Sequence, residues 1–244
     1  MKQNFYIDDF TESNYERLVD IAKERYRFIF FDEKTPIEPH VIWRHDVDFS
    51  IHRALRLAEI EAKLGVKSTY FLLLHSEMYN VLEKRCYIKI LEIEKLGHQL
   101  GLHFDQSFYQ IQSQQELIDK VSFEKALLEN LLNVKIRAIS FHNPVFDSGL
   151  NIKQEKIADL INTYGARIYD NYKYVSDSNG YWRFDRLEDV LKDSTYNRLQ
   201  VLTHPEWWVP SPMLPRARVQ RCIMGRAEAI SNFYDDFHKI SGRY

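Results

Sequence analysis

The chain has 244 residues, of which 45% are hydrophobic and 28% charged, as is typical of a soluble globular protein. It contains no linker-like or repetitive segment, so we expect one domain spanning residues 1–244. The net charge of −2 gives no electrostatic reason to bind nucleic acid or an anionic membrane. The two cysteines, Cys86 and Cys222, lie far apart and indicate neither a disulfide framework nor a zinc ribbon.

No apolar run approaches the roughly 20 residues that a transmembrane helix needs, and the N-terminal residues contain no signal-peptide core. We therefore expect a cytoplasmic protein without a membrane span. The sequence does not predict an oligomeric state.

Helix-like and strand-like segments alternate along the chain. Helices are predicted at 13–25, 50–65, 85–96, 113–133, 152–164 and 215–240. Strands are predicted at 27–31, 40–44, 66–74, 98–104, 137–142, 167–170, 181–184 and 198–204. Residues that favour helix N-termini mark three helix starts, namely the capping boxes Ser13/Glu16 and Ser113/Glu116 and the N-cap Ser50. Glycines that favour helix C-termini mark three helix ends, namely Gly65, Gly97 and Gly165. This alternation predicts a parallel sheet covered by helices, either a barrel or a doubly wound sheet.

Polar residues gather where four of these strands end. The segments are RHDVD (44–48), LHFD (102–105), FHNP (141–144) and THPEWW (203–208). They contain four of the nine histidines, namely His45, His103, His142 and His204. Because ligands bind at the carboxyl ends of parallel strands, this clustering predicts a functional site.

Strand geometry assigns these residues to faces. Residues two apart share a face, so Arg44, Asp46 and Asp48 should point the same way, with neighbouring alpha carbons roughly 6–7 Å apart. Both carboxylates could then reach one metal ion, or one could bind it while the other acts on a water. His103 and Asp105 also share a face. His98 does not, and a hydrogen-bonded core histidine is the favoured interpretation of it.

The Pro-flanked segment that contains Trp207 and Trp208 cannot easily bury both rings, so we expect one of them to line the cleft. Pro205 restrains His204 to an extended conformation, which would help to aim its side chain.

With these motifs, the chain resembles the polysaccharide deacetylase superfamily, carbohydrate esterase family 4 and its relatives. It is most similar to a divergent branch with an RHDVD first motif and a second motif of the GHxxGxH type, here GHQLGLH (97–103). The resemblance implies a distorted (β/α)-barrel of about seven parallel strands, a divalent metal, commonly zinc, and hydrolysis of an acetyl group on a sugar. It also implies that Asp46 is the general base, Asp48 and His103 are metal ligands, and His204 is the general acid.

Two features depart from the family pattern. Val47 separates the two carboxylates that are usually adjacent, so the roles of Asp46 and Asp48 could be exchanged. Ser107 stands where a second histidine ligand is expected. His142 is the favoured third ligand, because imidazole suits zinc, with Asp105 and His98 as alternatives.

The expected mechanism combines a metal held by Asp48, His103 and His142 with proton transfer by Asp46 and His204. Arg44 would keep Asp46 ionised and aimed, while Trp207, Trp208, Asn143 and Asp105 would contact the substrate. Two other functions stay open. One is a catalytically inactive carbohydrate-binding relative, and the other is a glycosyltransferase that uses the DVD segment to hold a metal and a nucleotide sugar.

Overall fold

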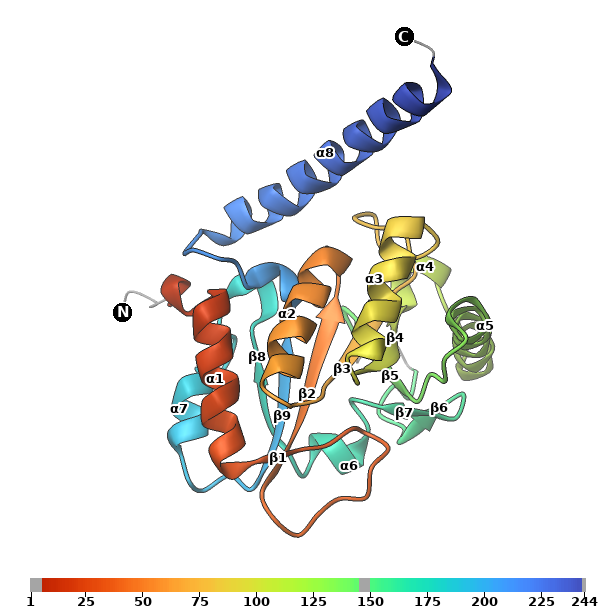
Figure 1. Ribbon diagram of the computed structural model, residues 1–244. Coiled ribbons are helices and arrows are strands. Elements are labelled where there is room, and N and C mark those ends of the chain that lie inside the picture. Colours follow the sequence, from red (N-terminus) through yellow and green to blue (C-terminus); the bar gives the residue numbers. More distant parts are fainter. Residues whose placement is uncertain (1–5, 145–149, 243–244) are drawn as a thin grey trace.

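A curled, mostly parallel sheet forms the centre of the computed structural model, which describes residues 6–144 and 150–242 (Figure 1). Its strands are β1 (Arg27–Phe28), β2 (His40–Val47), β3 (Thr69–Leu73), β4 (Gln99–Asp105), β5 (Ala138–His142), β6 (Lys156–Ile157), β7 (Leu160–Asn162), β8 (Lys173–Ser176) and β9 (Arg198–Thr203). The order is β6-β7-β5-β4-β3-β2-β9-β8, with β1 paired to β2.

Every pair from β7 to β8 along this order is parallel, which makes seven consecutive parallel strands within the described residues. Strand β6 runs antiparallel at one edge. The two ends of the sheet do not pair with each other in the described part of the chain, so the strands form a half-barrel. The predicted α/β fold with a distorted barrel of about seven parallel strands is confirmed.

Helices cover the outside of the sheet (Figure 1). They are α1 (Glu12–Arg25), α2 (Ile51–Lys63), α3 (Lys84–Lys95), α4 (Gln106–Tyr109), α5 (Gln114–Leu132), α6 (Ala166–Tyr169), α7 (Leu187–Lys192) and α8 (Pro215–Ser241). Short 3-10 turns occur at Ile7–Asp9, Ser178–Gly180 and Pro205–Trp207. Among the described helices, none combines the length and apolar character that crossing a bilayer requires.

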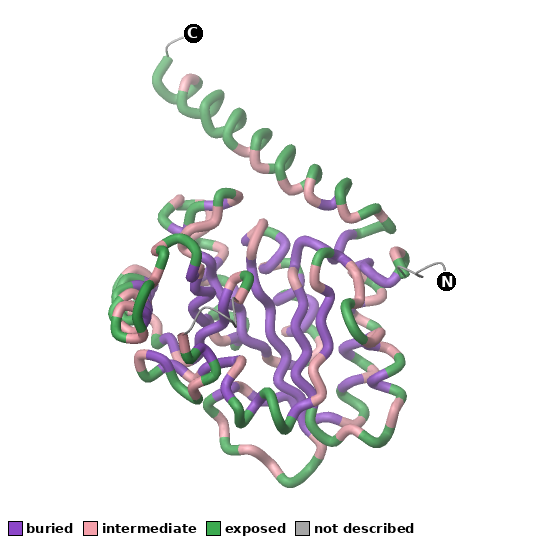
Figure 2. Tube along the Cα trace, turned by 180° about the vertical axis from the view of Figure 1, so that it is seen from behind, coloured by how far each residue is buried: buried purple, intermediate pink, exposed green. Residues whose placement is uncertain are grey.

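The central strands are buried on both faces, as expected of a parallel sheet between helices and a filled interior (Figure 2). Burial of this apolar surface is the main source of stability in such a fold. Helix α8 differs from the other helices, because it runs away from the body and most of its side chains are exposed (Figures 1 and 2).

Two of the three predicted N-caps are confirmed. Ser50 accepts a hydrogen bond from the Arg53 amide at the start of α2, and Ser113 accepts one from the Glu116 amide at the start of α5. The cap predicted at Ser13 is wrong. Thr11 caps α1 instead by accepting from the Asn14 amide, so the helix begins at Glu12.

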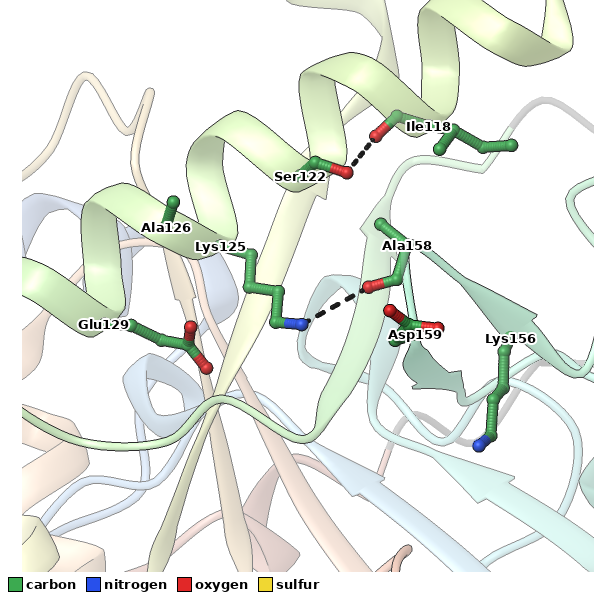
Figure 3. A pocket seen from close by; sticks show the side chains of 8 residues that line it. All are labelled: Ile118, Ser122, Lys125, Ala126, Glu129, Lys156, Ala158 and Asp159. Carbon is green, nitrogen blue, oxygen red and sulfur yellow. Dashed lines mark hydrogen bonds between the residues drawn. The ribbon is translucent and has the colours of Figure 1, made fainter.

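The helix predicted at 152–164 is also wrong, because this segment forms the β6–β7 hairpin. Ala158 and Asp159 adopt positive φ angles of 50° and 66° in its turn, a geometry that suits a two-residue hairpin connection. The side-chain amide of Asn162 donates hydrogen bonds to the carbonyl oxygens of Ile152 and Gln154. These two carbonyl groups would be paired within a helix, and Asn162 pairs them here instead. Figure 3 shows the turn against α5, where Lys125 donates to the Ala158 carbonyl at 3.5 Å.

Two predicted strands are not observed. Residues 167–170 lie largely in the single-turn helix α6, whose Ile168 is buried, and residues 181–184 form no strand. The strand that completes the parallel run is β8, which sequence patterning missed because alternation is weak in so short a segment.

Candidate active site

Side-chain alternation along β2 divides the charged residues at its end between two faces. Arg44 and Asp46 point toward Ser140 of β5, which lies inside the half-barrel. His45 points the opposite way, where its Nε2 lies 2.8 Å from Glu61 of α2. His45 is therefore a fully buried structural residue on the helix side and takes no part in the candidate site.

Asp48, His103 and His142 come together at the carboxyl end of the sheet. Asp48 Oδ1 lies 3.1 Å from His103 Nε2 and 3.5 Å from His142 Nδ1. One potential ligand atom from each residue lies within 4.8 Å of the others. His103 comes from β4 and His142 from β5, which pair in parallel and so end at the same edge.

The electrostatics of this cluster favour a charged carboxylate between two imidazoles. Burial raises the pKa of Asp48, but His103 and His142 beside it outweigh that effect and lower the pKa well below its usual value. The Asp48 contact in turn raises the pKa of His142. Asp48 Oδ1 is buried without a hydrogen-bond partner among the described residues. A carboxylate and two imidazoles form a donor set that fits zinc with a position left for substrate.

Asp46 is held beside this cluster by Arg44 and Ser140. Ser140 Oγ donates to Asp46 Oδ2 at 2.9 Å and accepts from Arg44 Nη1 at 2.7 Å, while Arg44 Nη1 lies 3.7 Å from Asp46 Oδ1. Thr163 also accepts from Arg44 at 2.7 Å. Burial disfavours the charge of Arg44, yet Asp46 and neighbouring tyrosines raise its pKa above the usual value. His103 Nδ1 lies 3.9 Å from Asp46 Oδ2, so Asp46 flanks the cluster.

His204 lies on the other side of Asp48. Its Nδ1 donates to Asp177 Oδ1 at 2.7 Å, and its Nε2 lies 3.9 Å from Asp48 Oδ2. Asp177 also accepts from the His204 backbone amide and from the indole of Trp208. Burial lowers the pKa of His204, but the hydrogen bond and charge of Asp177 dominate and raise it well above its usual value.

Asp105 and His98 lie outside the metal cluster. Asp105 Oδ1 caps α4 by accepting from the amide and hydroxyl of Ser107, at 2.9 Å and 2.6 Å. His98 Nδ1 accepts from the Ser68 amide, and its Nε2 lies 3.1 Å from the Ala58 carbonyl oxygen. His98 is thus the hydrogen-bonded core histidine that we favoured. Neither residue supplies a ligand to the group formed by Asp48, His103 and His142.

Asn143 adopts a positive φ of 47° and places its amide nitrogen 3.0 Å from His142 Nε2. That contact orients the ring whose Nδ1 faces Asp48, as partners of ligating histidines often do. A direct substrate contact by Asn143 stays a prediction.

The tryptophan assignments need a correction. Trp208 is fully buried and its indole nitrogen is bound to Asp177, so it presents no ring face to a sugar. Its predicted stacking role is wrong, and it instead fixes Asp177. Trp207 is also buried, at 7% exposed, so the expectation that the segment cannot bury both rings is wrong. A role of Trp207 in substrate binding stays a prediction.

Four polar residues near the site were missed by sequence analysis, namely Ser140, Thr163, Asp177 and Glu206. Glu206 is fully buried, and neither carboxyl oxygen has a hydrogen-bond partner in the described part of the chain. Burial raises the pKa of Glu206 well above its usual value, and the charge of Asp48 raises it further. Of these four residues, only Glu206 lies inside a motif that the sequence analysis singled out, THPEWW, so only Glu206 could have been found from the sequence.

Comparisons with known proteins give matches among solved structures only, since no family model and no curated protein matches the chain. A family 4 carbohydrate esterase from Bacillus anthracis is 10% identical, with a TM-score of 0.46 over 86% of each chain. A Streptococcus pyogenes deacetylase in complex with acetate is 14% identical, with a TM-score of 0.42 over 84% of each chain. A family 4 pseudoenzyme from Bacillus anthracis is 16% identical, with a TM-score of 0.39 over 83% of this chain and 64% of that one.

Proposed function

We propose that this protein is a metal-dependent hydrolase that removes an acetyl or related acyl group from an amino sugar or a sugar-containing precursor. The observation that carries the proposal is the arrangement around Asp48. Asp48, His103 and His142 each offer a potential ligand atom within 4.8 Å of the others, Asp46 lies 3.9 Å from His103, and His204 lies 3.9 Å from Asp48.

Asp48, His103 and His142 would hold the ion, which we propose to be zinc. When bound, such an ion polarises the acyl carbonyl of a substrate and makes a nearby water more acidic. The donor set supports zinc because two imidazoles and one carboxylate are common at catalytic zinc sites.

Asp46 would act as the general base. It has one buried oxygen, Oδ1, without a hydrogen-bond partner among the described residues, while Ser140 holds the other. Arg44 lies beside the carboxyl and fixes its direction through Ser140, so that Asp46 can accept a proton from the attacking water.

His204 would act as the general acid. Asp177 binds Nδ1, which leaves Nε2 pointing toward Asp48 and available to donate a proton to the leaving amine or hydroxyl. The raised pKa favours the protonated imidazole, which suits an acid.

The test is acetate release from N-acetylated amino sugars by the zinc-loaded protein. Asp46→Asn preserves side-chain volume and should reduce kcat by about 100-fold or more, because a general base is lost. Asp20→Asn, at an exposed position on α1, is the matched control and should retain activity.

The two other functions give different results. Binding of sugars without turnover in wild type would favour the inactive relative, and release of a nucleotide from a nucleotide sugar would favour the glycosyltransferase. Either result would contradict the hydrolase proposal.

A further inference from the structure

A cavity of about 550 Å³ lies beside the candidate active site, between the start of α2, the loop before α3, and α8. Phe49 and Ser50, which line the cavity, directly follow Asp48 in the sequence. Tyr79, another lining residue, donates to the Val47 carbonyl oxygen at 2.7 Å. A cavity of this size falls within the range of small-molecule sites.

The lining of this cavity is predominantly cationic. Among the described residues it includes five lysine or arginine side chains and two glutamates, namely Arg53, Arg85, Lys89, Arg221, Arg226, Glu83 and Glu228. Glu83 is engaged by two of the arginines, Arg85 at 2.7 Å and Arg226 at 3.0 Å. In the described part of the chain no ion pair involves Lys89, Arg221 or Glu228, so the lining keeps two unpaired positive charges against one unpaired negative charge.

Two further observations indicate positive potential there. Burial lowers the pKa of His52 on the cavity wall, and the charges of Lys89, Arg53 and Arg221 lower it further. Arg53 is 4% exposed, and although its Nη2 binds Glu12 and the Trp208 carbonyl, its Nε is buried without a partner among the described residues.

We propose that this cavity binds a phosphate group carried by the substrate, so that the protein deacylates a phosphorylated or nucleotide-linked amino sugar. The inference rests on the proposed hydrolase function and names its substrate class. Lys89 on α3 and Arg221 on α8 supply the unpaired positive charges that bind the phosphate. The apolar side chains of Ile51, Met78 and Met224 line the remainder of the cavity.

The spacing fits one sugar ring. Asp48 and Ser50 are two residues apart, so their alpha carbons are separated by at most roughly 7–8 Å. The Ser50 edge of the cavity is thus within reach of a pyranose whose acetamido group lies at the Asp48 cluster and whose neighbouring ring position carries the phosphate.

The experiment measures binding by calorimetry to protein freed of metal, so that phosphate cannot bind through an ion. The probes are N-acetylglucosamine 1-phosphate, N-acetylglucosamine, inorganic phosphate and uridine diphosphate N-acetylglucosamine. The double variant Lys89→Gln/Arg221→Gln is compared with Lys84→Gln/Arg216→Gln, which removes the same charge from exposed positions on the same two helices, outside the cavity lining.

We expect wild type to bind the sugar phosphate at least about tenfold more tightly than the unphosphorylated sugar. Lys89→Gln/Arg221→Gln should lose that advantage, whereas Lys84→Gln/Arg216→Gln should keep it. If the nucleotide sugar binds more tightly than the monophosphate, the inference is supported and the phosphate belongs to a nucleotide diphosphate. If the monophosphate binds more tightly, the inference is supported and the phosphate is a monoester.

Equal affinity for both sugars, or an equal loss in both double variants, would overturn the inference. So would inorganic phosphate that binds as tightly as the sugar phosphate, because the cavity would then be an anion site unrelated to the sugar. The proposed function fails separately. In that case the zinc-loaded protein releases acetate from none of the acetylated probes, while binding of the sugar phosphate to the metal-free protein still depends on Lys89 and Arg221.

Discussion

At the scale of single residues, the most informative pair is His204 and Asp177. Asp177 is fully buried and accepts hydrogen bonds from the His204 ring, the His204 amide and the Trp208 indole. Burial lowers the pKa of His204, but the hydrogen bond and charge of Asp177 outweigh that effect and raise it. A substitution at Asp177 should therefore change the pKa of His204 without altering the His204 ring.

Asp177→Asn should move the high-pH limb of the activity profile to lower pH, by about one unit or more. The sign follows from the role of an acid. His204 must be protonated, activity is lost as pH rises through its raised pKa, and removal of the Asp177 charge lowers that pKa. The measurement is kcat against pH for wild type and variant, with Asp20→Asn as control. A high-pH limb that stays in place would rule out His204 as the group that titrates there.

At the scale of elements, Gly101 shows how β3 and β4 fit together beneath the site. A Cβ at Gly101 would lie 2.4 Å from the Phe71 ring, and the Arg44 guanidinium lies 5.7 Å from the centre of that ring. The glycine in the second motif thus leaves room for an aromatic ring that supports Arg44.

Gly101→Ala should lower the free energy of unfolding by about 1–3 kcal/mol, because the buried Phe71 ring must shift. Urea denaturation of Gly101→Ala, Phe71→Leu and the double variant measures this effect. The double variant should cost less than the sum of the single variants, since leucine vacates the contact. Gly225→Ala on α8, where nothing lies within 4 Å, should not destabilise the protein. Additive costs for Gly101 and Phe71 would contradict the packing explanation.

Helix α2 is joined to β2 and β3 by the buried Glu61. This carboxylate contacts His45 at 2.8 Å and accepts hydrogen bonds from the hydroxyls of Ser68, Tyr70 and Tyr15. Burial raises the pKa of Glu61, but His45, His98 and Ser68 dominate and lower it to about 2.

The pKa of Glu61 is lower in the folded chain than the usual 4.5, so its ionised form stabilises the fold above pH 4.5. That contribution, on the order of 3 kcal/mol, should be lost as pH falls from 4.5 toward 2. Unfolding measured across this range should show a weaker pH dependence in Glu61→Gln than in wild type. Glu59→Gln, on the exposed face of α2, is the control and should show the same pH dependence as wild type. An unchanged pH dependence in Glu61→Gln would contradict this explanation.

At the scale of the whole molecule, sequence periodicity was sufficient for the parallel sheet because buried strands and amphipathic helices alternate clearly from residue 40 to 142. It failed from 152 to 184, where short strands and a one-turn helix depend on tertiary contacts such as those of Asn162. The strand-end rule brought Asp48, His103 and His142 to one edge. It could not identify Asp177 or Ser140, because their functional contacts join residues 27 and 94 positions apart in the chain.

The most direct test of the account is the zinc content of the purified protein after zinc supplementation, measured by elemental analysis. Wild type should hold close to one zinc ion per chain, and Asp48→Ala, His103→Ala and His142→Ala should each lose most of it. Asp105→Ala and His98→Ala, which change the two alternative ligands, should retain it if they fold. Wild type without bound metal, or loss in Asp105→Ala but not in His142→Ala, would contradict the site described here.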